Sequence, residues 1–209
     1  MYIPDMFRED RPDVLHDAVR SIGFATLITD GLEANHLPML LQDGENGLVL
    51  RGHVARANPV WKRGGGQALA IFLGPHAYVS PNWYPSKAET GKAVPTWNYI
   101  TVHARGAIRW VDDADWLRTH VGALSAAHEA GRDVPWMISD APVTYIDSML
   151  RGIVGFELSI EKLEGKYKLS QNREPADHAG AREGLMREGR TDVARLMTRP
   201  EPKPETKQD

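Results

Sequence analysis

The 209-residue sequence contains no cysteine. This absence excludes disulfide bonds, thiolate catalysis and cysteine-ligated zinc or iron–sulfur centres, and it fits a reducing compartment. Long apolar runs are missing as well, since no stretch approaches the roughly 20 residues of a membrane-spanning helix. The N-terminal residues show no basic segment followed by an apolar one. We therefore expect a cytoplasmic protein without a membrane partner.

The chain also lacks a strong excess of charge of either sign. Its 25 Lys and Arg residues and 28 Asp and Glu residues give a formal net charge of −3 and a pI near 6.2. Nucleic-acid-binding domains usually carry a basic surface. Direct DNA binding would therefore need a local basic patch.

Apolar patterns and turn residues predict a mainly β protein with attached helices. Without regular strand–helix–strand alternation, an antiparallel barrel is favoured over a parallel sheet. Strands are expected at 24–29, 33–41, 48–53, 68–73, 99–111 and 153–163, with 167–169 extending the sheet after a turn. Pro38 indicates a bulge or an edge in the second of these strands.

Helix signals lie between and after these strands. Helices are expected at 12–22, directly after Asn58-Pro59, from about 113 to 130, from 142 to 150 and over 177–197. The last segment has the length and the arginines of a DNA-binding helix pair. A polar C-terminal helix pair is the alternative that we prefer.

Residues 50–99 have the composition of a binding site, because His, Arg, Asn, Trp and Tyr lie there between glycines and prolines. A strand that ends near His53 and a helix that starts at Asn58-Pro59 would direct backbone N–H groups toward an anion, with Arg56 beside them. In the alternative interpretation, Arg56 pairs with a carboxylate and Asn58 only caps the helix.

Aromatic residues follow in the same stretch. Tyr78, Trp83, Tyr84, Trp97 and Tyr99 lie among amide and hydroxyl donors, and such a group suits a flat heteroaromatic ligand. Trp and Tyr are also enriched at protein interfaces. A ligand pocket and a dimer interface therefore both stay open.

Histidines lie in or beside several predicted strands, at positions 36, 53, 76 and 103. No pair has the His-x-His or His-x-x-x-His spacing of a metal site. We expect hydrogen-bonded or ligand-edge histidines and no metal. His120, on a predicted helix, is expected at a solvent-facing or interface position.

A set of motifs spans nearly the whole chain up to Asn172: Met1-Tyr-Ile-Pro, His36-Leu-Pro, Gly52-His-Val-Ala-Arg-Ala-Asn-Pro, Gly74-Pro-His-Ala-Tyr-Val-Ser-Pro, Trp83-Tyr, Val94-Pro-Thr-Trp-Asn-Tyr, Gly152-Ile-Val-Gly and Lys168-Leu-Ser-Gln-Asn. With these motifs the chain resembles the PaiB-type FMN-binding negative transcriptional regulators. That family shares the FMN-binding split-barrel fold with pyridoxamine-phosphate oxidase-like proteins.

The resemblance implies an antiparallel FMN-binding split β-barrel with C-terminal helices. Residues 1–172 would form the FMN-binding domain, 173–198 a helical extension, and 199–209, rich in proline and charge, a disordered tail. The family binds FMN at a homodimer interface.

The resemblance also implies a set of cofactor-binding residues. The phosphate would lie at His53, Arg56 and Asn58, near Arg51. The flavin ring would lie against the strand with His36 and Leu37, while Trp97 and Asn98 suit the part of the pocket that the partner copy supplies. The lysine and serine common in the phosphate segment of the oxidase branch are absent here. Either flavin affinity is modest, or Lys168 and Ser170 complete the site.

Three functions follow as hypotheses. The first is a homodimeric FMN-binding regulator that represses through flavin or partner binding; a DNA or other regulatory partner follows only from the family name. The alternative is an FMN-dependent oxidoreductase acting on a small molecule, with the flavin supplying the chemistry. A haem-binding split-barrel protein is the third, because a histidine ligand is available. Catalytic residues are not predicted.

Overall fold

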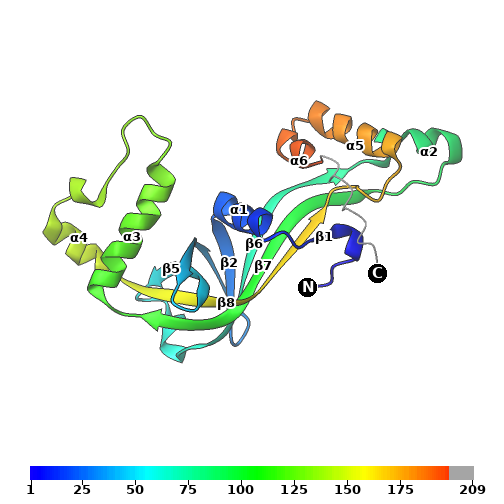
Figure 1. The fold of residues 1–209 in the computed structure, drawn as a ribbon. Helices are drawn as coiled ribbons and strands as arrows, with labels where there is room; N and C mark the ends of the chain where they lie inside the picture. The colour runs from blue at the N-terminus through cyan, green and yellow to red at the C-terminus, as the bar shows by residue number, and fades with distance from the viewer. Residues whose placement is uncertain (198–209) are drawn as a thin grey trace, which may run out of the picture. The chain divides into compact units, whose positions relative to one another are not determined.

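The computed structural model describes residues 1–197; the predicted tail at 199–209 lies outside them. In chain order the elements are 3-10 helix η1 (Asp5–Phe7), β1 (Arg8–Glu9), α1 (Pro12–Ile22), β2 (Phe24–Thr29), β3 (Glu33–Pro38), β4 (Leu40–Gly44), β5 (Gly47–Ala55), η2 (Pro59–Arg63), β6 (Gly66–Val79), η3 (Pro81–Trp83), α2 (Pro85–Thr90), β7 (Thr96–Val111), α3 (Ala114–Glu129), η4 (Ile138–Asp140), α4 (Val143–Leu150), β8 (Ile153–Lys168), α5 (Pro175–Arg187) and α6 (Thr191–Leu196) (Figure 1).

The strands form one sheet in the order β3-β2-β6-β7-β8-β5-β4, and β1 pairs with β8. The pairs β2–β3, β2–β6, β4–β5 and β5–β8 are antiparallel. Strands β3 and β4 lie at opposite ends of this order, yet a single residue, the buried Met39, joins them. One residue spans only a few ångströms, so the sheet must curl until its ends meet, and β3 contacts β5. The predicted antiparallel barrel is confirmed.

Contacts divide the chain into two compact units. Unit 1 comprises residues 1–9, 73–101 and, among the described residues, 165–197; unit 2 comprises 10–72 and 102–164. Strands β6, β7 and β8 contribute residues to both units. None of the boundaries between these units falls after residue 172, where the sequence predicts the end of the FMN-binding domain. That domain boundary stays a prediction.

Unit 2 holds the curled part of the sheet with α1, α3 and α4. Its buried side chains include Val19 of α1 together with Leu27, Leu50 and Phe156 of three strands, and each such side chain contributes roughly 1.5–3 kcal/mol. The helices α3 and α4 pack on one another through Leu117, Ile146 and Leu150 and lie side by side in Figure 1.

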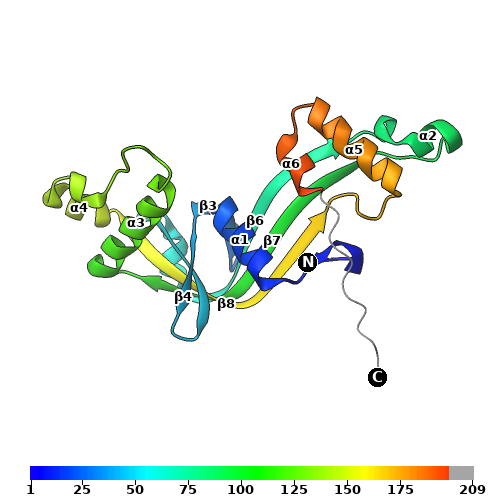
Figure 2. The same cartoon turned by 45° about the horizontal axis from the view of Figure 1, so that its top comes forward.

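Unit 1 has a core of its own, built from buried residues of β6, β7, the two C-terminal helices and the segments that flank η3, β8 and α6: Ala77, Val79, Tyr84, Ile100, Leu169, Ala181, Leu185, Val193, Ala194 and Met197. Helices α5 and α6 contact each other and α5 contacts η3 and α2 (Figure 2). A Cβ on Gly184 would lie 2.2 Å from Cδ2 of Trp83, so only glycine lets the indole approach α5. The predicted C-terminal helical segment is therefore a helix pair whose inner face is apolar.

The observed elements depart from the predicted ones in several places, among them the following. The strand expected at 33–41 breaks at Met39 into β3 and β4. The helix expected after Asn58-Pro59 is the five-residue 3-10 helix η2. No turn interrupts β8 at residues 164 and 165, because Gly165 and Lys166 pair with β1, a long-range partner that local turn signals do not reveal.

No helix among residues 1–197 is long and apolar enough to cross a membrane.

Candidate functional site

The junction between β5 and η2 in unit 2 is where the sequence predicts the FMN phosphate. The Oδ1 atom of Asn58 accepts a hydrogen bond from the Val60 N–H at 3.0 Å, and its Nδ2 donates to Oδ1 of Asn35 at 2.6 Å. Asn58 therefore caps η2, as predicted, and is tied to β3 at the same time. Because η2 has only five residues, its helix dipole adds little to anion binding.

Arg56 at this junction is already neutralised. Its NH1 and NH2 donate to Oδ2 and Oδ1 of Asp112 at 2.8 and 2.5 Å, and its Nε donates to the carbonyl of Arg151 at 2.7 Å. NH2 also reaches the carbonyl of Ile153 at 3.0 Å. The hydrogen bond to Asp112 raises the pKa of Arg56 and lowers the pKa of Asp112. A carboxylate thus holds Arg56, and its phosphate-binding role stays a prediction.

Two histidines, the half-buried His53 and the buried His120, meet next to this junction. Nδ1 of His53 on β5 lies 3.1 Å from Nε2 of His120 on α3, and the His120 ring stacks on Trp116 with centroids 5.2 Å apart. Burial lowers the pKa of both histidines, that of His120 to about 4, and the charge of Arg51 contributes to the lowering for His120. Both rings are therefore neutral at pH 7 and share one hydrogen bond.

The expectation for His120 was wrong. Its side chain is buried together with Leu117 and Leu124 on one face of α3. Their spacing is that of a helical face turned toward a core, and this spacing is the signal that could have placed the ring.

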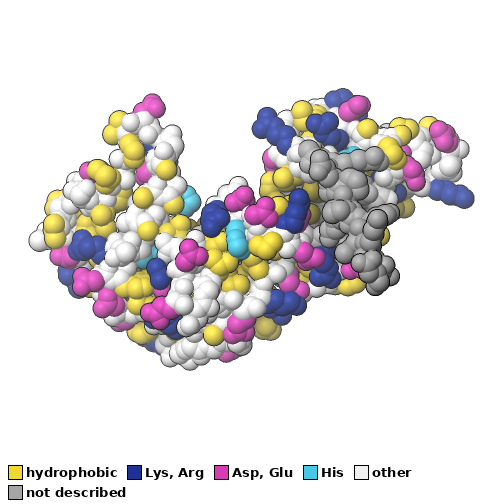
Figure 3. Space-filling view, viewed as in Figure 1, with side chains coloured by type: hydrophobic (Ala, Val, Ile, Leu, Met, Phe, Trp, Pro, Cys, Tyr) yellow, Lys and Arg dark blue, Asp and Glu magenta, His cyan; other side chains and the backbone are white. Residues whose placement is uncertain are grey.

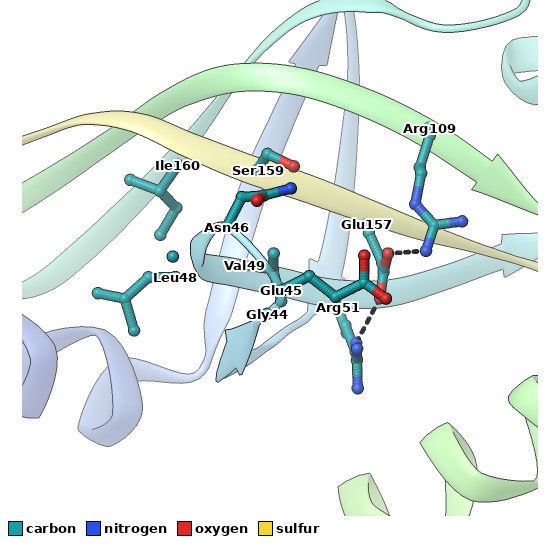
Figure 4. A pocket seen from close by; sticks show the side chains of 11 residues that line it. Gly44, Glu45, Asn46, Leu48, Val49, Arg51, Arg109, Glu157, Ser159 and Ile160 are labelled. Carbon is teal, nitrogen blue, oxygen red and sulfur yellow. Dashed lines mark hydrogen bonds and ion pairs between the residues drawn. The ribbon is translucent and has the colours of Figure 1, made fainter.

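Arg51 lies beside a polar pocket of about 270 Å³ formed by the β4–β5 turn, β7 and β8 (Figure 4). Nε of Arg51 donates to Oε1 of Glu157 at 2.7 Å, and NH1 donates to Oε1 of Gln42 at 3.0 Å. The exposed Arg109 pairs with the other oxygen of Glu157. One buried carboxylate thus serves two arginines, and because Glu45 also lines the pocket, its basic side chains are balanced by acidic ones.

The remaining predicted residues of unit 2 have local partners. Nδ1 of His36 lies 3.0 Å from Oγ1 of Thr26 across the β2–β3 pair. Leu37 packs against Val54 and Val60. Among residues 1–197, no group of three or more His, Asp or Glu side chains is arranged to hold a metal ion.

The four predicted residues of unit 1 lie together where β7 starts and β8 ends. The ammonium of Lys168 donates to Oγ1 of Thr96 and, at 2.6 Å, to the carbonyl of Trp97. Oγ of Ser170 donates to Oδ1 of the fully buried Asn98 at 3.0 Å. Ser170 has φ = 62°, a left-handed conformation that costs a non-glycine residue about 1 kcal/mol or more. The side-chain bonds to Asn98 and the start of β7 hold this strained loop.

The aromatic residues of the binding stretch divide into two groups. Trp97 and Tyr78 are about half exposed, and the Trp97 ring lies 6.1 Å from that of His76 and 6.2 Å from that of Tyr78. We call His76, Tyr78 and Trp97 the exposed aromatic cluster. Tyr84 is buried in the core of unit 1, so it has a structural role.

Sequence reasoning missed the partners that set the chemistry of both regions. Asp112 neutralises Arg56, and Glu157 neutralises Arg51. Lys166 and Arg173 add charge near Lys168. Only for Lys166 and Arg173 was a sequence signal present, since they flank the Lys168-Leu-Ser-Gln-Asn motif.

Comparison with known proteins identifies the family. The family described as "Putative FMN-binding domain" matches residues 1–162. This chain belongs to it. The predicted family, the split-barrel fold and the cofactor, FMN, are thereby confirmed.

Two curated relatives extend the match over most of the chain. The Bacillus subtilis "Protease synthase and sporulation protein PAI 2" is 33% identical over 193 residues, which cover 90% of both chains. An uncharacterized protein of Emericella nidulans is 32% identical over 239 residues, covering 94% of both. Among solved structures, the FAD and haem binding protein from Mycobacterium smegmatis matches with a TM-score of 0.54 at 15% identity, covering 77% of this chain and 73% of that one. At that identity the likeness concerns the fold.

Proposed function

We propose that this protein is a regulator that binds FMN at the interface of a homodimer and acts through the flavin-bound state or through a partner. The observation that carries the proposal is the family match over residues 1–162, which includes every strand except the end of β8. It supports FMN binding by the domain to which these strands belong.

The residues that we propose to contact FMN are those of the sequence motifs. They are His36, Leu37, Arg51, His53, Arg56 and Asn58 in unit 2, and Trp97, Asn98, Lys168 and Ser170 in unit 1. FMN needs cationic donors for its phosphate and flat, partly apolar surfaces for its ring. The ammonium of Lys168 and the exposed face of Trp97 meet these needs, so the residues present fit the cofactor. When bound, FMN supplies a redox-active ring; the protein binds and orients it.

The exposed aromatic cluster supports the homodimer. Tyr78 and Trp97 leave about half of their surfaces exposed, and Val94 nearby in the sequence is 66% exposed. Aromatic side chains of this kind are enriched at interfaces. A second copy of the chain would cover them and would add its own residues to the flavin pocket.

The regulatory role rests on the relatives and on the charge distribution. The name of the Bacillus subtilis relative refers to protease synthesis and sporulation. In Figure 3, Lys and Arg side chains lie over α5 and α6, yet acidic side chains are interspersed over the visible face, and Glu183 and Asp192 pair with arginines of these helices. Such a surface favours control through flavin or a protein partner over a broad DNA-binding face.

The test begins with the visible spectrum of the purified protein and the mass of the released cofactor. We expect a flavin spectrum, FMN as the released compound, and a dimer by light scattering. A colourless protein that does not bind added FMN would refute the proposal. Rapid reduction of the flavin by NAD(P)H would instead support the oxidoreductase alternative, and inert flavin with operator retention at moderate salt would support direct repression.

A further inference from the structure

Within the described residues, the charge of Lys168 has no acidic partner. Among residues 1–197, no carboxylate lies within ion-pair distance of the Lys168 ammonium, whose partners are the hydroxyl of Thr96 and the carbonyl of Trp97. Both partners are neutral. A half-buried ammonium with only neutral acceptors keeps most of its desolvation cost.

Two further cations lie near this lysine along the chain, Lys166 two positions earlier on β8 and Arg173 in the turn between β8 and α5. Lys166, also on β8, donates to the carbonyl of Tyr2 at 3.2 Å and lies 5.6 Å from the ring centroids of Tyr2 and Tyr99. The guanidinium of Arg173 lies 4.8 Å from the ring centroid of Tyr84. Desolvation lowers the pKa of Lys168, and the charges of Lys166 and Arg173 lower it further. Both cations therefore disfavour the charged form of Lys168.

The acidic side chain of this unit that lies close to Tyr84 is already engaged. Oδ1 of Asp177 accepts from the Ser86 N–H at 3.0 Å, and Oδ2 accepts from Oγ of Ser86 at 2.6 Å. Asp177 is buried, so it fixes α5 to α2 and does not pair with the three cations. Within residues 1–197, their charge is therefore available to a ligand.

Hydrogen bonds hold the turn between β8 and α5, which carries Arg173. Oε1 of Gln171 accepts from the Leu169 N–H at 2.7 Å, and the Arg173 N–H donates to the carbonyl of Ser170 at 3.0 Å. Together with the Ser170–Asn98 bond, these contacts fix the strained turn between β8 and α5. Strain that the surroundings hold in place is typical of functional sites.

We propose that Lys166, Lys168 and Arg173 form an anion site for a phosphate monoester, and that this site, more than Arg56, supplies the positive charge that binds the phosphate of FMN. The proposal rests on the proposed FMN binding for the source of the phosphate. A phosphate monoester carries close to two negative charges and three acceptor oxygens, which suits three clustered cations. The guanidinium of Arg56 already donates hydrogen bonds to Asp112 and to two carbonyl groups.

The experiment compares FMN with riboflavin, which lacks the phosphate. Dissociation constants are measured by flavin fluorescence for the full-length wild type, for Lys168→Gln and for Lys92→Gln. Lys92 is an exposed lysine in the same unit, so it controls for the change in net charge. Thermal unfolding with inorganic phosphate at matched ionic strength provides a second readout, and far-UV circular dichroism checks the fold.

We expect Lys168→Gln to weaken FMN binding roughly 10- to 100-fold, as for a lost charged hydrogen bond, and to leave riboflavin binding and the Lys92→Gln control unchanged. If FMN does not bind to the wild type but phosphate stabilises it and fails to stabilise Lys168→Gln, the anion site holds for another phosphate monoester and the proposed function fails. If the wild type and Lys168→Gln bind FMN equally, the anion site is refuted while FMN binding stands.

Discussion

The two regions where the sequence places the FMN phosphate have cations in opposite electrostatic states. At the β5–η2 junction, Asp112 neutralises Arg56 and Glu157 neutralises Arg51. At the end of β8, the acceptors of Lys168 in the described part of the chain are neutral, and the charges of Lys166 and Arg173 act on it. The comparison teaches that a basic residue in a binding motif indicates a site only after its partners are known. An arginine that is paired with a carboxylate stabilises the fold, whereas a lysine without an acidic partner favours the binding of an anionic ligand.

The largest expected effect is the loss of stability at the β5–η2 junction in acid. The pKa of His120 is lowered from 6.5 to about 4 in the folded protein, so its contribution to stability is complete above pH 6.5 and is lost as the pH falls from 6.5 toward 4. The loss is at most about 3 kcal/mol. Urea unfolding at pH 7 and pH 4.5 measures it.

The variants His120→Gln and His128→Gln sharpen this test. His128 is exposed on the same helix. We expect His120→Gln to reduce the pH dependence and His128→Gln to leave it as in the wild type. An identical pH dependence in all three proteins would show that the histidine pair does not control acid stability.

The next variant disturbs the packing of α5, the helix that follows the turn with Arg173. Gly184→Ala would bring a Cβ to 2.2 Å from the Trp83 ring, and such overpacking costs about 2 kcal/mol. We expect α5 to dock less tightly, which displaces Arg173 and weakens FMN and phosphate binding together. Chemical denaturation followed by ligand titration measures both effects.

Gly122→Ala is the matched control, because its Cβ would meet its nearest neighbour, Cγ2 of Ile138, at 4.0 Å. In a helix this change is expected to be neutral or to stabilise by up to about 1 kcal/mol. Equal losses for Gly184→Ala and Gly122→Ala would contradict the steric argument.

Arg56→Ala tests the arginine that pairs with Asp112. From the sequence, strong weakening of FMN binding with an intact fold is expected. Because Arg56 already pairs with Asp112, we expect a smaller loss of FMN affinity than for Lys168→Gln. We also expect a lower melting temperature, because the carbonyl groups of Arg151 and Ile153 lose their donor. A larger loss of FMN affinity for Arg56→Ala than for Lys168→Gln would reverse the comparison.

The smallest expected effect is the stability of the ligand-free Lys168→Gln variant. Because the folded pKa of Lys168 is lowered, its charge opposes folding at pH 7, and wild-type stability should rise as the pH increases toward the unfolded value of 10.5. We expect the variant to melt at the same temperature as the wild type or slightly above it, and to show less of this rise. A clearly lower melting temperature would mean that the bonds to Thr96 and Trp97 outweigh the uncompensated charge.

Much of the fold could be read from local sequence signals. Pro12 and Gly23 bound α1, Asp30-Gly31 forms the turn between β2 and β3, and Asp113 caps α3, as residue preferences predict. The extent of β6 through Pro75 and of β8 through Gly165 was not predictable, since neighbouring strands distant in sequence decide it. In the candidate site, too, local signals indicate the motif residues but not their partners from distant parts of the chain.

The sequence by itself determined the family, its cofactor and the motif residues, because these depend on residue identity along the chain. Tertiary structure alone decided which of the basic residues among them pair with a carboxylate. Asp112 lies 56 positions from Arg56, and Thr96 lies 72 positions from Lys168, so no local pattern couples them. The physical reason is that charge balance depends on distance in space, where a carboxylate a few ångströms away cancels a guanidinium and a hydroxyl leaves an ammonium charged.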